Sequence, residues 1–223
     1  MKKVLLALVV AGVMAGCASN SDQAPVNTTP VPAMGKVADG AFTRFAYNDN
    51  SSEAWIVHEN ADLGLGDVSP SPLTASGDAG SLRLSFPVVN ENTTEDLGPA
   101  VSQIIPNISP DTDYVLTVYY RDDKGDNSAN TLELGVKDAG VESLTGNLIR
   151  SKLFTNKDIG GDNDKNDETG GFRKVTMAFN SGSNTTLEVY VMSHLTGKDD
   201  LAASEDMTEQ TQVFIDDISL EID

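Results

Sequence analysis

The sequence contains very little cysteine and histidine. One Cys among 223 residues excludes an intrachain disulfide and a thiolate metal cluster. Two His, at positions 58 and 194, exclude a zinc site built from three imidazoles. The chain also has no nucleophile-elbow pentapeptide, no His-Glu-x-x-His motif and no phosphate-binding loop. The commonest sequence signatures of hydrolases and nucleotide-binding enzymes are therefore missing.

Basic residues are scarce as well. There are 15 Lys and Arg against 34 Asp and Glu, which gives a formal net charge of -19. Nucleic-acid binding depends on clustered Lys and Arg that neutralise phosphates, so this composition argues against a nucleic-acid partner. Aromatic residues make up only 6% of the chain, but 223 residues still suffice to bury one core.

The N-terminus reads as a targeting segment. Lys2 and Lys3 precede an apolar run over residues 4–13, and the tetrad at 14–17 is Met-Ala-Gly-Cys. This tetrad resembles the bacterial lipobox, which implies a signal peptide over 1–16 and acylation of Cys17. Ala18 in place of Asp implies sorting to the outer membrane, with the lipid as the membrane anchor. The alternative is an ordinary secreted protein with a stray Cys.

The rest of the chain predicts one all-β domain. Residues 17–35 have the Ser, Thr, Asn and Pro content of a flexible linker, and 36–223 form the domain. Short segments with period-two alternation indicate about ten strands, so we expect an antiparallel β-sandwich. The expected strands are 41–47, 54–59, 81–88, 100–105, 113–121, 131–137, 147–154, 172–180, 185–194 and 212–222. The windows 60–73 and 198–209 are the two stretches that have the length of a helix.

Alternation also assigns faces, because successive side chains on a strand point to opposite sides. The apolar sets predicted to face the core are Tyr114, Leu116, Val118 and Tyr120; Leu132, Leu134 and Val136; Val175, Met177 and Phe179; and Leu187, Val189 and Val191. The outward sets are Tyr119 and Arg121; Glu133, Gly135 and Lys137; and Glu188, Tyr190, Met192 and His194.

Four groups of segments resemble carbohydrate-binding modules of families four, nine, sixteen and twenty-two. They lie at 75–84, 101–120, 171–179 and 213–220. The resemblance implies a jelly roll of the galactose-binding type that binds polysaccharide without cleaving it. It also implies a structural Ca²⁺ site at Asp217, with Asp216 beside it. Phe42-Thr43 stands where the families have a Phe-Glu pair, so the second carboxylate is absent.

A sugar-binding face combines rings that stack on CH groups with side chains that pair with hydroxyls. Such a face forms if the two strands that carry Tyr119, Arg121, Glu188, Tyr190 and His194 lie in one sheet. The alternative for each Tyr is ordinary cross-strand packing. Trp55 is expected in the core.

Charge and chemistry leave the ligand and the function class open. Arg121, Lys137 and Lys174 face outward, and a basic strip would suit a uronate polymer such as alginate. A second hypothesis is a jelly-roll polysaccharide lyase or hydrolase, in which Arg121, Tyr190 and His194 supply the catalytic groups. A third is a structural or adhesive envelope lipoprotein. We expect a monomer in each case.

Overall fold

The computed structural model describes residues 35–47, 53–78, 80–159 and 170–223. The predicted signal peptide over 1–16 and Cys17 lie outside the described residues, as does the predicted linker up to position 34. Within the described ranges, no helix combines the length and the apolar character needed to cross a membrane.

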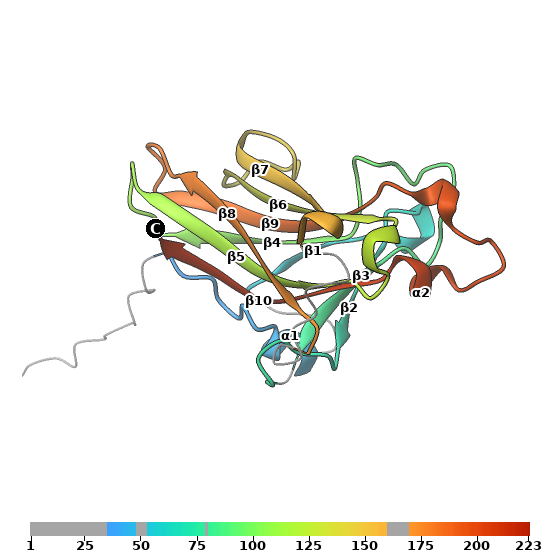
Figure 1. The fold of residues 1–223 in the computed structure, drawn as a ribbon. Coiled ribbons are helices and arrows are strands. Elements are labelled where there is room, and N and C mark those ends of the chain that lie inside the picture. The colour runs from blue at the N-terminus through green and yellow to red at the C-terminus, as the bar shows by residue number, and fades with distance from the viewer. Residues whose placement is uncertain (1–34, 48–52, 79, 160–169) are drawn as a thin grey trace, which may run out of the picture. The chain divides into compact units, whose positions relative to one another are not determined.

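The fold is the predicted antiparallel β-sandwich of jelly-roll type (Figure 1). The strands are β1 (Ile56–His58), β2 (Asp67–Ser71), β3 (Ser81–Ser85), β4 (Ala100–Pro106), β5 (Asp113–Arg121), β6 (Asn130–Asp138), β7 (Leu148–Thr155), β8 (Arg173–Asn180), β9 (Thr186–Leu195) and β10 (Val213–Ile222). Two five-stranded sheets face each other. The β9 sheet has the order β1-β4-β9-β6-β7 and the β5 sheet has the order β2-β3-β10-β5-β8.

Short helices occupy the connections. They are α1 (Thr43–Tyr47), η1 (Ala61–Leu63), η2 (Gly125–Asn127), η3 (Lys157–Ile159), η6 (Lys198–Asp200) and α2 (Met207–Thr211). The predicted strand over 41–47 is wrong, because α1 occupies most of it. The chain turns at Phe42, where φ is 51°, and the Asp39 carboxylate accepts a hydrogen bond from the Arg44 N–H at 3.0 Å.

Strand β2 was missed because Pro70 and nearby glycines interrupt the window 60–73. Proline has no N–H to donate to a ladder, so it belongs on an edge strand. The structure places β2 at the edge of its sheet, where Pro70 faces Leu82 of β3.

The core lies between the two sheets and contains every inward set predicted from alternation. Strand β8 shows why alternation predicts the inward residues, because its residues are alternately buried and exposed along its whole length. Trp55 is buried in the core as expected. Its ring lies 5.1 Å from that of Phe42, and its indole N–H donates to the Asp39 carbonyl at 2.9 Å. Packing of alternate side chains therefore determines which residues remain for the two outer faces.

Candidate functional site

The five residues predicted to form one sugar-binding face lie on two different sheets. Tyr119 and Arg121 belong to β5, whereas Glu188, Tyr190 and His194 belong to β9. Both sets point away from the core, so they lie on opposite sides of the sandwich. The expectation of a single face is therefore wrong. It failed because alternation assigns a side chain to a face but does not say which strands pair.

Arg121 is occupied by interactions on its own side of the sandwich. Its guanidinium binds the Asp123 carboxylate through two hydrogen bonds of 2.9 Å and donates to the Gly170 carbonyl at 2.7 Å. The lyase constellation of Arg121, Tyr190 and His194 is consequently not assembled. Tyr119 is half-buried and packs beside Phe172 and Phe214.

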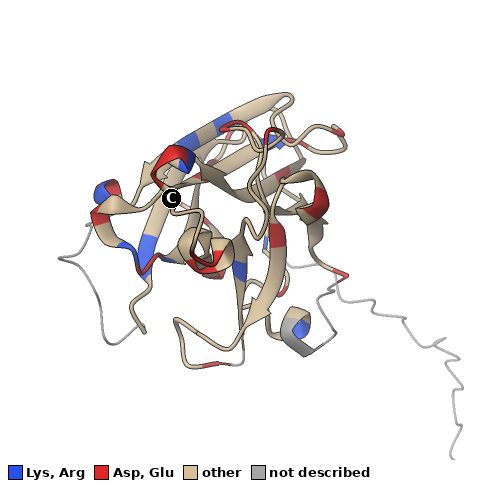
Figure 2. Ribbon diagram, turned by 90° about the vertical axis from the view of Figure 1, so that its right-hand side faces the viewer, with Lys and Arg blue, Asp and Glu red and all other residues tan. Residues whose placement is uncertain are grey.

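The predicted basic strip does not form either. Arg121 and Lys174 lie on the β5 sheet, but Lys137 lies on the β9 sheet and is fully buried. Figure 2 shows acidic residues spread over many loops and short helices, with several Lys and Arg on the strands. The prediction of a uronate ligand depended on this basic strip, and the three residues do not form one.

The outer face of the β9 sheet carries a buried polar network. Tyr190 donates a hydrogen bond to one oxygen of Glu133 at 2.8 Å, and Nε2 of His194 lies 2.7 Å from the other. Met192 faces Glu133 directly across the ladder, so Tyr190 and His194 are its diagonal neighbours. Lys137 and Glu188 face each other and form an ion pair of 3.2 Å.

Burial and hydrogen bonding set the protonation of this network. Burial alone would raise the pKa of Glu133, but the hydrogen bonds from His194 and Tyr190 outweigh it and hold that pKa below its ordinary value. Burial, and then the bond to Glu133, raise the pKa of the Tyr190 hydroxyl well above its usual range. Tyr190 is therefore a neutral hydrogen-bond donor and is unsuited to act as a base.

Burial also lowers the pKa of His58, on β1, which lies within hydrogen-bonding distance of the Ser102 hydroxyl at 2.9 Å. The buried cation of Lys137 acts in the same direction, while Glu188 opposes it. His58 is thus favoured in its neutral form, with one ring nitrogen occupied by Ser102.

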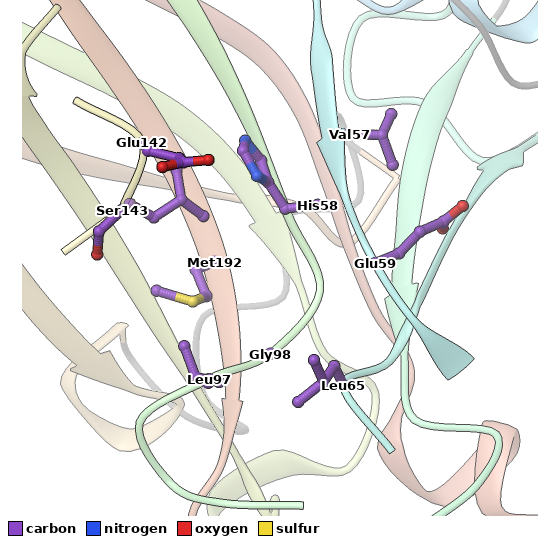
Figure 3. Close-up of a pocket in the computed structure, with 10 residues that line it drawn as sticks. Val57, His58, Glu59, Leu65, Leu97, Gly98, Glu142, Ser143 and Met192 are labelled. Atoms are coloured by element: carbon purple, nitrogen blue, oxygen red, sulfur yellow. The ribbon is translucent and has the colours of Figure 1, made fainter. Parts of the chain in front are cut away.

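Two hollows lie over this outer face. The first encloses about 450 Å³ and is lined by Val57, His58, Glu59, Leu65, Leu97, Gly98, Glu142, Ser143, Leu144 and Met192. The second encloses about 520 Å³ and is lined by Glu95, Asp96, Leu97, Glu133, Thr145, Leu153, His194 and Thr196. Leu97 belongs to both linings, so the hollows adjoin. Figure 3 shows Glu142 of the first hollow extending toward His58, with Met192 and Leu97 on one side.

The chemistry of the linings is aliphatic and acidic. Among the described residues, no Tyr, Trp or Phe and no Lys or Arg lines either hollow. Of the predicted binding residues only His194 lines one, whereas Tyr190 is fully buried and Glu188 lines neither. Sequence reasoning placed Glu133 on this face but missed the loop residues Leu97 and Glu142, because a single sequence does not reveal loop positions.

The predicted calcium ligands lie on β10, where the pairing with β5 shifts register between Asp216 and Ser219. Both oxygens of the buried Asp216 accept backbone N–H groups, from Ala75 and Asp217, at 2.8 Å each. Calcium takes six to eight oxygen ligands. In the part of the chain that the structure describes, no three acidic, His or Cys side chains form a metal-binding group. The residues present thus do not complete a calcium shell, and Ca²⁺ at Asp217 stays a prediction.

Asp216 gives the first expected outcome. Burial raises its pKa to about 7 and outweighs the two backbone hydrogen bonds, which lower it, while repulsion from Asp217 and Asp78 adds to the rise. The unfolded state then loses its proton near pH 4 and the folded state only near 7, so stability falls as pH rises between these values. The cost above pH 7 is on the order of 4 kcal/mol. We expect Asp216→Asn to flatten this fall in chemical denaturation at pH 4.5 and 8.

The same experiment addresses calcium. If Asp216 and Asp217 hold Ca²⁺, millimolar Ca²⁺ restores the stability of the parent at pH 8 and has no effect on Asp216→Asn. Identical melting temperatures of the parent in Ca²⁺ and in chelator would reject the calcium site. An unchanged pH profile in the Asn variant would reject the raised pKa of Asp216.

No family model matches the chain, and no curated protein matches it. Among solved structures, the enzymatically active domain of tailspike protein 4 from bacteriophage CBA120 has a TM-score of 0.48 at 11% identity, over 84% of this chain. This chain spans only 21% of that tailspike chain.

Two carbohydrate-binding modules are also similar. TmCBM61, solved with β-1,4-galactotriose, has a TM-score of 0.47 at 15% identity, over 83% of this chain and 96% of that one. The CBM22-2 xylan-binding domain from Paenibacillus barcinonensis Xyn10C has a TM-score of 0.45 at 11% identity, over 84% and 98%. At these values the similarity assigns no residue and no ligand.

Proposed function

We propose that this chain binds polysaccharide without cleaving it, in the two adjoining hollows over the β9 sheet. One observation carries the proposal: the hollows share Leu97 and together present aliphatic side chains beside carboxylate and imidazole groups. Sugars offer CH faces to aliphatic groups and hydroxyls to carboxylates. Both volumes fall within the usual range of roughly 300 to 1,000 Å³ for ligand sites.

The composition of the walls favours an uncharged polymer. Glu59 and Glu142 line the first hollow, and Glu95, Asp96 and Glu133 line the second. Like charges brought together across an interface weaken binding, so a uronate would be repelled. We therefore place alginate as the comparison ligand and neutral glycans, including β-1,4-galactan and xylan, as the expected ones.

A substitution at Leu97 tests the location. Leu97 is 48% exposed, so Leu97→Ser is expected to leave stability unchanged and to weaken binding about tenfold by removing apolar contact from both hollows. Leu63→Ser is the matched control, since Leu63 is 51% exposed and lines neither hollow. Affinity electrophoresis over a glycan panel selects the ligand, and calorimetry then measures both variants.

Equal losses in Leu97→Ser and Leu63→Ser would reject this location. Absence of binding to every neutral and acidic glycan would reject glycan binding itself and favour the structural or adhesive function.

The proposal includes a lipid anchor at Cys17, supported by the sequence of residues 1–18. Several acyl chains are needed for stable anchoring, so Cys17→Ser is expected to move most of the protein from the membrane fraction to the soluble fraction. Fractionation of a Gram-negative host, with radiolabelled palmitate as the probe, checks this expectation. Continued sedimentation of the Ser variant with the outer membrane would contradict the anchor.

A further inference from the structure

Two loops contribute to the walls of both hollows. Residues 86–99 connect β3 to β4, and residues 139–147 connect β6 to β7. The first loop contributes Glu95, Asp96, Leu97 and Gly98, and the second contributes Glu142, Ser143, Leu144 and Thr145. The shape of the site therefore depends on how these two loops are held against the sheet.

Lys137 holds the second loop from below. Its ammonium donates to the carbonyl oxygens of Val141 and Ser143, the latter at 2.9 Å, and pairs with Glu188 at 3.2 Å. An ammonium has three hydrogens, and these three acceptors use all of them. The hydrogen bonds that residues 139–147 form with one another are local to the loop, and the bond from the Asp138 N–H to the Asn147 carbonyl continues the β6–β7 hairpin. Lys137 thus supplies the polar link between this wall and the sheet beneath it.

His194 holds the first loop in a similar way. Its Nδ1 lies 2.7 Å from the Glu95 carbonyl oxygen, and its Nε2 lies 2.7 Å from the Glu133 carboxylate. The buried ring therefore bridges the backbone of the first loop and the carboxylate of Glu133 on the neighbouring strand.

We infer that Lys137 and His194 are positioning residues for the glycan site, each a buried side chain that fixes one wall loop through backbone carbonyl groups of that loop. This inference rests on the proposed function. Each side chain is paired with a buried acid of the neighbouring strand, which offsets the cost of burying its polar atoms. Fixed walls need not be ordered when the ligand binds, so this arrangement raises affinity by pre-organisation. Lys137 acts entirely through the loop, because it lines neither hollow.

The Lys137 arm of the test uses a paired substitution. Lys137→Met combined with Glu188→Met removes both charges together, so neither is left buried alone, and such replacements are often neutral for stability. Glu188 lines neither hollow. In the full chain, we expect hydrogen exchange over residues 139–147 to accelerate at least tenfold, and the affinity for the selected glycan to fall about tenfold.

The matched control lies on the opposite sheet. Arg121 also pairs with an acid, Asp123, and donates to a loop carbonyl, that of Gly170, but it lies far from the hollows. Arg121→Met with Asp123→Asn is expected to leave glycan affinity and exchange over 139–147 unchanged, whatever its effect on the melting temperature. Equal losses of affinity in the two double variants would overturn the inference, because they would indicate a general effect of stability.

A second arm addresses His194. His194→Leu with Glu133→Leu is expected to accelerate exchange over residues 94–98, and only exchange is measured because both residues line a hollow. Unchanged hydrogen exchange over residues 139–147 in the first double variant would overturn the role of Lys137. Unchanged exchange over residues 94–98 in the second would overturn the role of His194. Faster exchange in a chain whose parent binds no glycan would reject the proposed function while supporting the loop contacts. Faster exchange with unchanged affinity would reject the positioning role and leave glycan binding intact.

Discussion

Replacing Glu133 by alanine is expected to lower the free energy of unfolding by about 3 to 5 kcal/mol. The Glu133 carboxylate accepts from both Tyr190 and His194, and all three side chains are buried. Its removal leaves the buried His194 ring and the buried Tyr190 hydroxyl without their shared partner, and breaking a buried hydrogen-bonded network in this way has a cost of this size. Urea denaturation at pH 7 measures the loss.

The dependence of stability on pH provides a second test of the Glu133 prediction. Because the folded state lowers the pKa of Glu133, its contribution is complete above the pKa of the unfolded state and is lost as pH falls through the folded pKa. The difference in the free energy of unfolding between the parent and Glu133→Ala should therefore become smaller below about pH 4. Glu221→Ala, an exposed acid of the β5 sheet, is the control. A loss below about 1 kcal/mol for Glu133→Ala would contradict the buried network.

Adding one methyl group at position 135 is expected to destabilise the chain by about 2 to 3 kcal/mol. Gly135 faces Tyr190 across the ladder, and a Cβ at 135 would lie 2.0 Å from two atoms of the Tyr190 ring. The ring is fully buried, it belongs to the cluster of Ala100, Tyr190 and Met192, and its hydroxyl is bonded to Glu133. The ring has no free direction in which to move, so Gly135→Ala forces overpacking despite the better strand propensity of alanine.

A double-mutant cycle tests the cause of that loss. Tyr190→Ala removes the ring, so adding Gly135→Ala to it should cost little or even stabilise the strand. Thermal and urea denaturation of the two single variants and the double variant give the coupling. Additive losses would show that Gly135 is required for its backbone and not for the space it leaves to Tyr190.

Alternation in single strands predicted most of the fold. The range 113–121 matches β5 throughout, and the inward sets of four strands all lie in the core. These features are local, because the two-residue period follows from the backbone of one strand. The failures involve contacts distant in sequence. Alternation over 41–47 predicts a strand where the structure has α1, and Pro70 interrupts the pattern of β2.

The candidate site was less predictable than the fold. The outward placement of Glu133, Lys137, Tyr190 and His194 was correct, but their pairing needs β6 and β9 to be neighbours, which one sequence does not state. Tyr119 was grouped with Tyr190 for the same reason. The exposure of outward residues also depends on the loops above them, and these loops bury Tyr190 and create the hollows. Gly135 lies within a strand and faces Tyr190, which it packs against closely. A glycine inside a predicted strand indicates such close packing, and the sequence analysis did not use it.

The most direct test of glycan binding over the β9 sheet is an NMR titration of the full chain with the oligosaccharide selected by the panel. Binding in the hollows predicts that the largest amide shift changes fall on residues 95–98 and 142–145 and on the outward positions of β9. Changes centred on the outer face of the β5 sheet, around Tyr119 and Arg121, would contradict it.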